Sequence, residues 1–225
     1  MRDVFEESMD SLDDIKQKIL HVCRRLYQWH MVDATGGNVS VRFGADRVIA
    51  TPTGMSKGFL QADDLVELDL EGRPLGRGKR TVTSEIGLYL RIFQARPDVA
   101  AAIHAHPPHA TAFAVTGRTL ATDALPESVV ILGKVPLVPY GTPGTDELYN
   151  EVEKFLPGHD VFLLANHGAL TLGKDVIEAY HRMECLEHTA MILSLAESLG
   201  GINRLNPEQV ATLLSIHKKR PLNKT

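Results

Sequence analysis

Residues 99–109 read VAAAIHAHPPH, an apolar run that ends in three histidines and two prolines. The part from 99 to 105 lacks the alternation of polar and apolar residues found in a half-exposed strand, so it predicts a strand covered on both faces. Side chains two residues apart point to the same face of a strand. His104 and His106 are therefore expected side by side, at a distance that one metal ion can bridge.

Predicted helices and strands alternate on both sides of this run. Apolar residues recur at helical spacing between residues 12 and 30, with Ser11 as the N-cap. Two β-like pieces at 39–43 and 47–51 predict a hairpin, and DLVELDLEGRPLG (64–76) predicts a further strand and turn.

The rest of the chain continues the alternation. Helices are predicted at 84–96, at 144–156, from 175 to about 199, and from 206 onward. The run DVFLLAN (160–166) predicts a buried strand that reaches a turn at Asn-His-Gly. Strands that alternate with helices indicate one α/β sandwich over residues 1–225, with a mixed sheet because of the early hairpin.

The composition excludes several classes of partner. The formal charge of −4 and the isoelectric point near 6.2 come without a basic stripe, which disfavours nucleic acid. No run approaches the roughly 20 apolar residues of a membrane-spanning helix, and the N-terminus lacks the apolar core of a secretion signal. Cys23 and Cys185 lie far apart in apolar helical contexts, as reduced packing residues do. We therefore expect a cytoplasmic protein with no membrane partner.

His167 is the third candidate metal ligand. It follows the other strongly buried strand, and the ends of such strands gather on one rim of an open α/β sheet, where ligands bind. Three neutral imidazoles with one open position are the arrangement of a catalytic zinc site. In a chain with ten histidines one His-x-His can also arise by chance. His109 is near enough in sequence to orient one of these ligands through a hydrogen bond.

Three polar stretches stand where loops are expected: TGGNVSVR (35–42), TPTGMSKG (51–58) and TVTSE (81–85). Glycine lets backbone N–H groups approach an anion, and a helix N-terminus favours phosphate. Together the stretches predict a phosphate site, although each alone is typical of a turn or a helix cap, as at Ser84. Glu85, in the first turn of a helix, is a candidate acid/base or metal ligand; its simpler role is a partner of the helix dipole.

The ordered set GGNVSVR, TPTG, TSE, HAH and NHG, between residues 36 and 168, resembles the class II aldolase/adducin family. Within that family it is similar to the zinc-dependent aldolases of ketose 1-phosphates, such as the L-fuculose-1-phosphate aldolases. The resemblance implies a three-layer α/β/α sandwich with a central mixed, largely antiparallel sheet. It also implies a cyclic homotetramer with active sites at subunit interfaces, and one zinc ion, or another divalent transition metal, per subunit.

The resemblance also implies a reaction and roles for residues. The substrate is a phosphorylated sugar of the fuculose, ribulose, 5-deoxy- or 5-methylthio-pentulose 1-phosphate type, cleaved to dihydroxyacetone phosphate and an aldehyde. His104, His106 and His167 bind the metal, and Glu85 is the general acid/base that also ligates the metal in the resting enzyme. The residues implied to hold the substrate phosphate are Gly37, Asn38, Thr53, Gly54, Thr83 and Ser84.

This chain departs from the family pattern at one point. Some of these aldolases use a tyrosine, from the region after His-x-His or from the C-terminal tail, for the proton on the aldehyde oxygen. Residues 107–139 and 215–225 contain no tyrosine. Glu127 stands at about the spacing where the related methylthioribulose-1-phosphate dehydratases place a catalytic glutamate, so it is either an additional acid/base or a solvated loop carboxylate.

Other functions on the same scaffold are the alternatives. The pentulose-phosphate 4-epimerases carry Asp where Glu85 stands, and the dehydratases lack the glutamate before His-x-His, so Glu85 disfavours both. Neither of these two arguments disfavours a decarboxylase of a phosphorylated keto acid. A metal-free binding module like the adducin head is disfavoured by the three histidines, by Glu85 and by the absence of a long basic tail.

Overall fold

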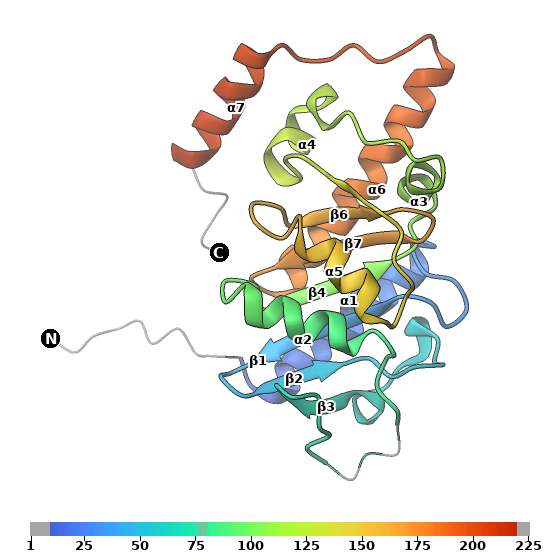
Figure 1. Ribbon diagram of the computed structural model, residues 1–225, viewed down its shortest axis with the longest axis vertical. Coiled ribbons are helices and arrows are strands. Elements are labelled where there is room, and N and C mark those ends of the chain that lie inside the picture. The colour runs from blue at the N-terminus through green and yellow to red at the C-terminus, as the bar shows by residue number, and fades with distance from the viewer. Residues whose placement is uncertain (1–9, 77, 79, 220–225) are drawn as a thin grey trace, which may run out of the picture.

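A seven-stranded mixed sheet forms the centre of the structure, a computed structural model that describes residues 10–76, 78 and 80–219. The strand order is β3-β2-β1-β4-β7-β6-β5 (Figure 1). The pair β5–β6 is parallel and the other five pairs are antiparallel. The strands are β1 (Asn38–Phe43), β2 (Arg47–Ala50), β3 (Val66–Asp69), β4 (Ala101–Ala105), β5 (Leu137–Val138), β6 (Val161–Leu164) and β7 (Gly168–Gly173).

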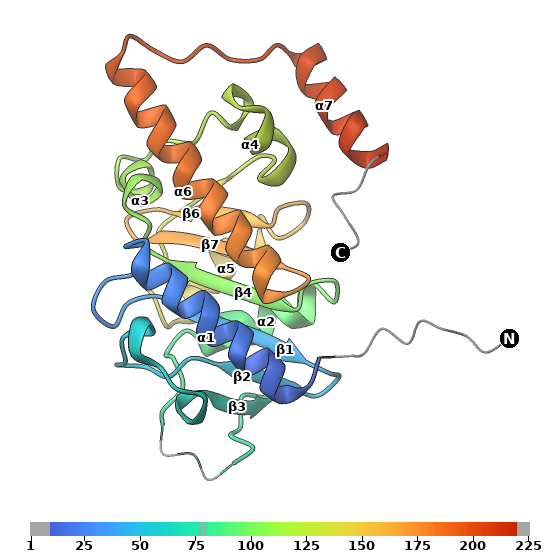
Figure 2. The same ribbon diagram turned by 180° about the vertical axis from the view of Figure 1, so that it is seen from behind.

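Helices cover both faces of the sheet and give three layers. One face is covered by α1 (Leu12–Gln28), α3 (Pro108–Val115) and α6 (Val176–Ser198), and the other by α2 (Ile86–Ala95) and α5 (Asp146–Glu153) (Figures 1 and 2). Two further helices, α4 (Pro126–Ile131) and α7 (Pro207–Lys219), pack on each other. The predicted α/β/α sandwich with a largely antiparallel sheet is confirmed. No helix in the described part of the chain is long and apolar enough to cross a membrane.

The two-sided burial of β4 explains its unbroken apolar sequence. Ala101, Ile103 and Ala105 belong to the core under α1 and α6, whereas Ala102 belongs to the core under α2 and α5. His104 has the same parity as Ala102, so its ring lies on the face that α2 covers. The periodicity of this strand therefore decides which helix faces the first histidine.

The helix starts follow the capping residues of the sequence. The Ser11 hydroxyl accepts a hydrogen bond from the Asp14 N–H, and the Asp14 carboxylate accepts one from the Ser11 N–H, so α1 begins with a full capping box. At α6 the Asp175 carboxylate accepts from the Glu178 N–H, but the Glu178 carboxylate accepts from the Lys174 N–H instead of closing the box.

The structure differs from the sequence prediction in three places. Residues 168–173 form β7, a strand that was not predicted between the Asn-His-Gly turn and the helix from 175, and Gly168 starts it directly after the β6–β7 turn. The short helices α3 and α4 were not expected. Glu85, rather than Ser84, is the N-cap of α2, since the first helical residue is Ile86.

Candidate active site

Three histidines from two separate parts of the chain meet at one edge of the sheet. His104 lies near the C-terminal end of β4, and His106 is the first residue after that strand. His167 lies in the turn between β6 and β7. Because β7 is antiparallel to both β4 and β6, these two strands run in the same direction and end at the same edge. The predicted shared rim is confirmed, although His167 lies three residues beyond Leu164, where β6 ends.

The rings are close enough to share one ion. One nitrogen atom from each ring lies within 4.8 Å of the others, and the described residues hold this one such group. The Nε2 atoms of His104 and His106 are 3.0 Å apart. The ring centroids of His104 and His167 are 4.4 Å apart, and those of His106 and His167 are 5.4 Å apart. The geometry therefore agrees with the three-histidine ligand set expected from the sequence.

Burial and hydrogen bonding favour the neutral rings that bind metals. The Nδ1 atom of His104 is 2.9 Å from the Ala169 carbonyl oxygen, which can only accept, so Nδ1 carries the proton and Nε2 is left with its lone pair. Burial and the neighbouring His106 lower the pKa of His104 to about 3. Burial and the neighbouring His104 lower the pKa of His167 to about 4. Both rings are neutral near pH 7.

Two buried polar atoms at the site would gain a partner from a bound cation. The Nδ1 atom of His167 and the Oε1 atom of Glu85 are buried without a hydrogen-bond partner. An unpaired buried polar atom costs about 1–3 kcal/mol. A divalent cation is an acceptable partner for imidazole nitrogens and for a carboxylate oxygen. The residues present therefore fit a divalent transition metal.

The Asn-His-Gly turn allows the close approach of the strands. Asn166 has φ of +55°, a left-handed conformation that asparagine tolerates better than most residues. A Cβ atom at Gly168 would lie 2.5 Å from the Ala105 carbonyl oxygen and 2.6 Å from Cδ2 of His106. Glycine is therefore required at 168 for this ring to keep its place.

Glu85 lies beside the histidines, and a hydrogen bond from Asn38 fixes its carboxylate. It is buried at the N-cap of α2, and its Oε2 atom is 3.9 Å from Nε2 of His104. The side-chain amide Nδ2 of Asn38 donates to the same Oε2 atom at 2.6 Å, and the Tyr89 hydroxyl donates to the side-chain Oδ1 atom of Asn38. Asn38 stands directly opposite His104 in the β1–β4 ladder, which explains how these groups meet.

Tyr89 is a site residue that the sequence analysis missed. Its side chain is fully buried, and burial together with the nearby Glu85 charge raises its pKa well above the usual value, so the hydroxyl keeps its proton and donates. The signal was the spacing of four residues between Glu85 and Tyr89, which puts both on one face of a helix. The sequence analysis placed Tyr89 within the predicted helix at 84–96 and gave it no role in the site.

The stretches expected to bind phosphate come together next to Glu85. Residues 51–54 run beside 81–85, because the Thr53 N–H donates to Thr81 and the Thr83 N–H donates to the Thr51 carbonyl. Gly37 adjoins β4, since a Cβ atom at this residue would lie 2.9 Å from the His104 carbonyl oxygen.

The six predicted phosphate ligands differ in exposure. Thr53, Gly54 and Ser84 are exposed, whereas Gly37, Asn38 and Thr83 are buried. The side chain of Asn38 already lies between Glu85 and Tyr89. The Asn38 side chain is therefore already hydrogen-bonded within the chain.

Two other predicted residues lie in different surroundings. The His109 ring is 2.7 Å from the Glu187 carboxylate of α6, which also accepts the His109 N–H at the start of α3. Glu127 is exposed in the first turn of α4, where its charge adds to the effect of burial in raising the pKa of Cys185. Glu127 is not part of the histidine group.

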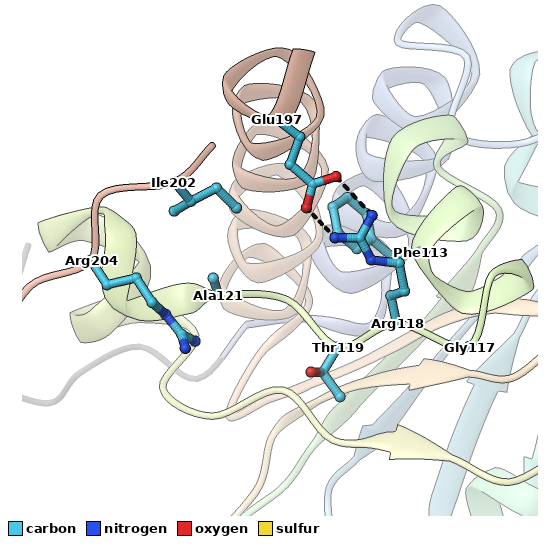
Figure 3. A pocket seen from close by; sticks show the side chains of 8 residues that line it. All are labelled: Phe113, Gly117, Arg118, Thr119, Ala121, Glu197, Ile202 and Arg204. Carbon is cyan, nitrogen blue, oxygen red and sulfur yellow. Dashed lines mark hydrogen bonds and ion pairs between the residues drawn. The ribbon is translucent and has the colours of Figure 1, made fainter. Parts of the chain in front are cut away.

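A hollow of about 450 Å³ lies away from the histidines, between α3 and the end of α6. Both of its arginines are paired. The Arg118 guanidinium faces the Glu197 carboxylate, with one bond of 2.7 Å (Figure 3). Arg204 binds Asp123 at 2.8 Å. The cations of this hollow are therefore already neutralised by carboxylates of the same chain.

Comparison with known proteins identifies the family. Residues 17–194 match the model of the class II aldolase and adducin N-terminal domain. The chain belongs to the class II aldolase and adducin family. Its histidine site agrees with the metal dependence of the class II aldolases.

Individual members of the family are similar over most of their length. An L-fuculose phosphate aldolase of Methanocaldococcus jannaschii is 39% identical over 180 residues, which are 80% of this chain and 96% of that protein. A 3-oxo-tetronate 4-phosphate decarboxylase of Haemophilus influenzae is 33% identical over 187 residues, which are 80% of this chain and 88% of that protein. A solved structure of an L-fuculose 1-phosphate aldolase has a TM-score of 0.83 at 30% identity and covers 94% of this chain and 99% of its own.

Proposed function

We propose that this class II aldolase family member is a zinc-dependent lyase that cleaves a ketose 1-phosphate to dihydroxyacetone phosphate and an aldehyde. The observation that carries the proposal is the position of the Glu85 carboxylate, 3.9 Å from one of three clustered imidazoles. The similarity to proteins named as fuculose phosphate aldolases supports it.

His104, His106 and His167 would hold the metal ion, with Glu85 as a further ligand before substrate binds. When bound, the cation supplies positive charge that stabilises the negative charge developing on substrate oxygens. The neutral state of the rings and the unpaired Nδ1 atom of His167 support this assignment. Zinc is proposed because three imidazoles with an open position are typical of its catalytic sites.

Glu85 is the proposed acid/base. Cleavage of the carbon–carbon bond leaves an electron pair on the carbon next to the ketone, and a carboxyl group must return a proton there. The Asn38 amide holds one oxygen of Glu85, which leaves Oε1 without a partner and available for this transfer. Tyr89 fixes the orientation of the Asn38 amide.

The phosphate of the substrate is proposed to bind between three loops, at Gly37 and Asn38, Thr53 and Gly54, and Thr83 and Ser84. Gly37 and Gly54 have φ of +67° and +70°, conformations that favour glycine and that are typical of backbone loops that bind anions. A Cβ atom at Gly54 would meet no atom within 4 Å, so the space beside it is open.

A decarboxylase is the second candidate, because a relative at 33% identity is named as one. Loss of carbon dioxide from a phosphorylated keto acid leaves a similar carbanion, so the same groups serve both reactions. The 4-epimerase and dehydratase alternatives are disfavoured by Glu85, and a metal-free binding module is disfavoured by the histidine group.

Cleavage also requires a base that takes the proton from the hydroxyl group that becomes the aldehyde oxygen. Glu127 remains the candidate, and its exposed position suits a role at the site of a neighbouring protomer. We further propose that the enzyme is a homotetramer with active sites at its interfaces, and that it acts in the cytoplasm, in keeping with its two free thiols, Cys23 and Cys185.

A substrate panel tests the reaction directly. The zinc-loaded enzyme is incubated with fuculose, ribulose, 5-deoxy- and 5-methylthio-pentulose 1-phosphates and, separately, with a 3-oxo-tetronate 4-phosphate. We expect release of dihydroxyacetone phosphate from at least one ketose 1-phosphate. Release of carbon dioxide from the keto acid alone would replace the aldolase with the decarboxylase, and no turnover of any substrate would contradict both.

A further inference from the structure

Lys57 is a buried cation that none of the steps above uses. Its side chain is 1% exposed, and it begins the short 3-10 helix η1 (Lys57–Phe59), which packs against α1. The Nζ atom donates hydrogen bonds to the carbonyl oxygens of Thr35 and Met55, each at 2.9 Å. Removing an ammonium group from water is costly, so its retention in the interior calls for a compensating role.

Both carbonyl groups belong to loops of the proposed phosphate site. Thr35 lies two residues before Gly37, and Met55 directly follows Gly54. The first loop contains two left-handed residues, since Ala34 has φ of +28° and Gly37 has φ of +67°. A left-handed conformation is unfavourable for alanine. One ammonium group therefore joins and restrains the two loops from the protein side.

The charge of Lys57 also meets a need that the proposed phosphate ligands leave open. A phosphomonoester carries about −1.5 to −2 charges near pH 7. The six proposed ligand residues are all uncharged. The N-terminus of α2 contributes a partial positive charge, but the negatively charged Glu85 stands at this same end. A full positive charge behind the loops would balance the phosphate without touching it, and its field is weakly screened because the side chain is buried.

We propose that Lys57 is a positioning residue for the substrate phosphate. It holds the loops at 35–37 and 53–55 in their binding conformation and supplies the positive charge beneath them. This inference rests on the proposed phosphate site, and it concerns the phosphate alone rather than the carbon–carbon cleavage at the histidines.

The test compares Lys57→Met, Lys57→Arg and the control Lys154→Met, all as full-length, zinc-loaded protein. Lys154 is an exposed lysine that pairs with Glu151 on α5. Binding of inorganic phosphate is measured by calorimetry, along with zinc content and kcat and KM for a cleaved ketose 1-phosphate. We expect Lys57→Met to weaken phosphate binding about 10- to 100-fold with zinc content unchanged, whereas Lys57→Arg recovers most of the affinity and Lys154→Met changes nothing.

A substrate pair separates a specific role from general damage. Lys57→Met is expected to raise KM for the phosphorylated ketose several-fold more than it slows cleavage of the unphosphorylated ketose, because only the first substrate carries a phosphate that interacts with the Lys57 charge. An equal loss for both ketoses, or wild-type affinity for inorganic phosphate, would overturn the proposal.

If Lys57→Met does not fold, the proposal is tested by diffraction from crystals of the wild-type protein with inorganic phosphate, which locates the bound anion. We expect the anion between the loops at 35–37 and 53–55 with the Lys57 bonds intact. An anion bound elsewhere would overturn the proposal. A wild-type enzyme that binds phosphate there but cleaves no ketose 1-phosphate would contradict the proposed reaction and leave the role of Lys57 standing.

Discussion

Glu85 shows how neighbouring residues decide the role of a side chain. A glutamate at the start of a helix commonly interacts only with the helix dipole. Here Asn38, 47 residues away in sequence, donates to Oε2, and the buried Tyr89 orients the Asn38 amide. The carboxylate is thereby fixed 3.9 Å from His104. Its position comes from three elements, β1, α2 and β4, and not from its own segment.

Replacement of Glu85 tests the acid/base role. Glu85→Gln keeps the shape of the side chain and an oxygen that can accept from Asn38, but it cannot carry the transferable proton. We expect zinc content and fold to be retained and kcat to fall about 10²- to 10⁴-fold. Glu71→Gln, an exposed carboxylate paired with Arg73, serves as the control. Undiminished cleavage by Glu85→Gln would remove this residue from the mechanism.

At the scale of elements, the β6–β7 hairpin accounts for the main failure of the sequence analysis. The six residues of β7 begin with the glycine of Asn-His-Gly and end with a second glycine, Gly173, so the local composition does not indicate a strand. The strand forms because β4, more than 60 residues earlier, pairs with it from Ala101↔Gly173 to Ala105↔Ala169. Pairing between strands so far apart in sequence depends on the whole sheet. A pattern within a short segment carries no information about it.

The capped helices and the two buried strands were predictable because their signals lie within short segments of the sequence. Ser11 with Asp14 and Asn206 with Gln209 make reciprocal cap bonds within four residues, so the signal is local. The clustering of the three histidines was also predictable, because parity along β4 and the shared edge of β4 and β6 follow from strand geometry. Tyr89 and Lys57 were not recognised, because their partners become neighbours only when the loops and sheet assemble.

Gly168 gives a test of the hairpin's part in the metal site. A methyl group at this residue would lie 2.5 Å from the Ala105 carbonyl oxygen and 2.6 Å from the His106 ring, so β4 and the turn must separate. We expect Gly168→Ala to weaken zinc binding at least about tenfold, measured by competition with a chromophoric chelator. The control is Gly87→Ala on α2, where the added atom meets open space. Equal zinc affinity of both variants would contradict the close approach.

At the scale of the whole molecule, the buried histidines link stability to pH. The pKa values of about 3 for His104 and about 4 for His167 lie below the value of about 6.5 for an unfolded histidine. At pH values between the folded-state and unfolded-state pKa, the unfolded chain binds more protons than the folded chain. The free energy of unfolding therefore falls as the pH falls below 6.5.

We expect zinc-stripped protein to lose on the order of 1–2 kcal/mol of stability per pH unit between about pH 6.5 and 5, measured by urea unfolding. His104→Gln should flatten this dependence, and His159→Gln, far from the site on the loop before β6, should not. A stability that stays constant over this interval would show that the rings are not held neutral by burial.

The proposed tetramer also belongs to this scale. The hollow between α3 and the end of α6 contains no member of the histidine group, and neither does a second hollow, which lies between α4 and α7. In the proposed tetramer a neighbouring protomer would complete the walls around the histidine group. We expect sedimentation velocity to give about four times the 24.7 kDa chain mass, with activity lost on dilution to monomer. A fully active monomer would refute interface sites.

The convergence of three imidazoles on one cation is tested most directly by diffraction at the zinc absorption edge, on protein purified without added metal. We expect one anomalous peak per chain, about 2.0–2.1 Å from a nitrogen of each of His104, His106 and His167. A well-ordered site with no peak among the three rings, in protein that cleaves its substrate, would contradict the metal-dependent reaction.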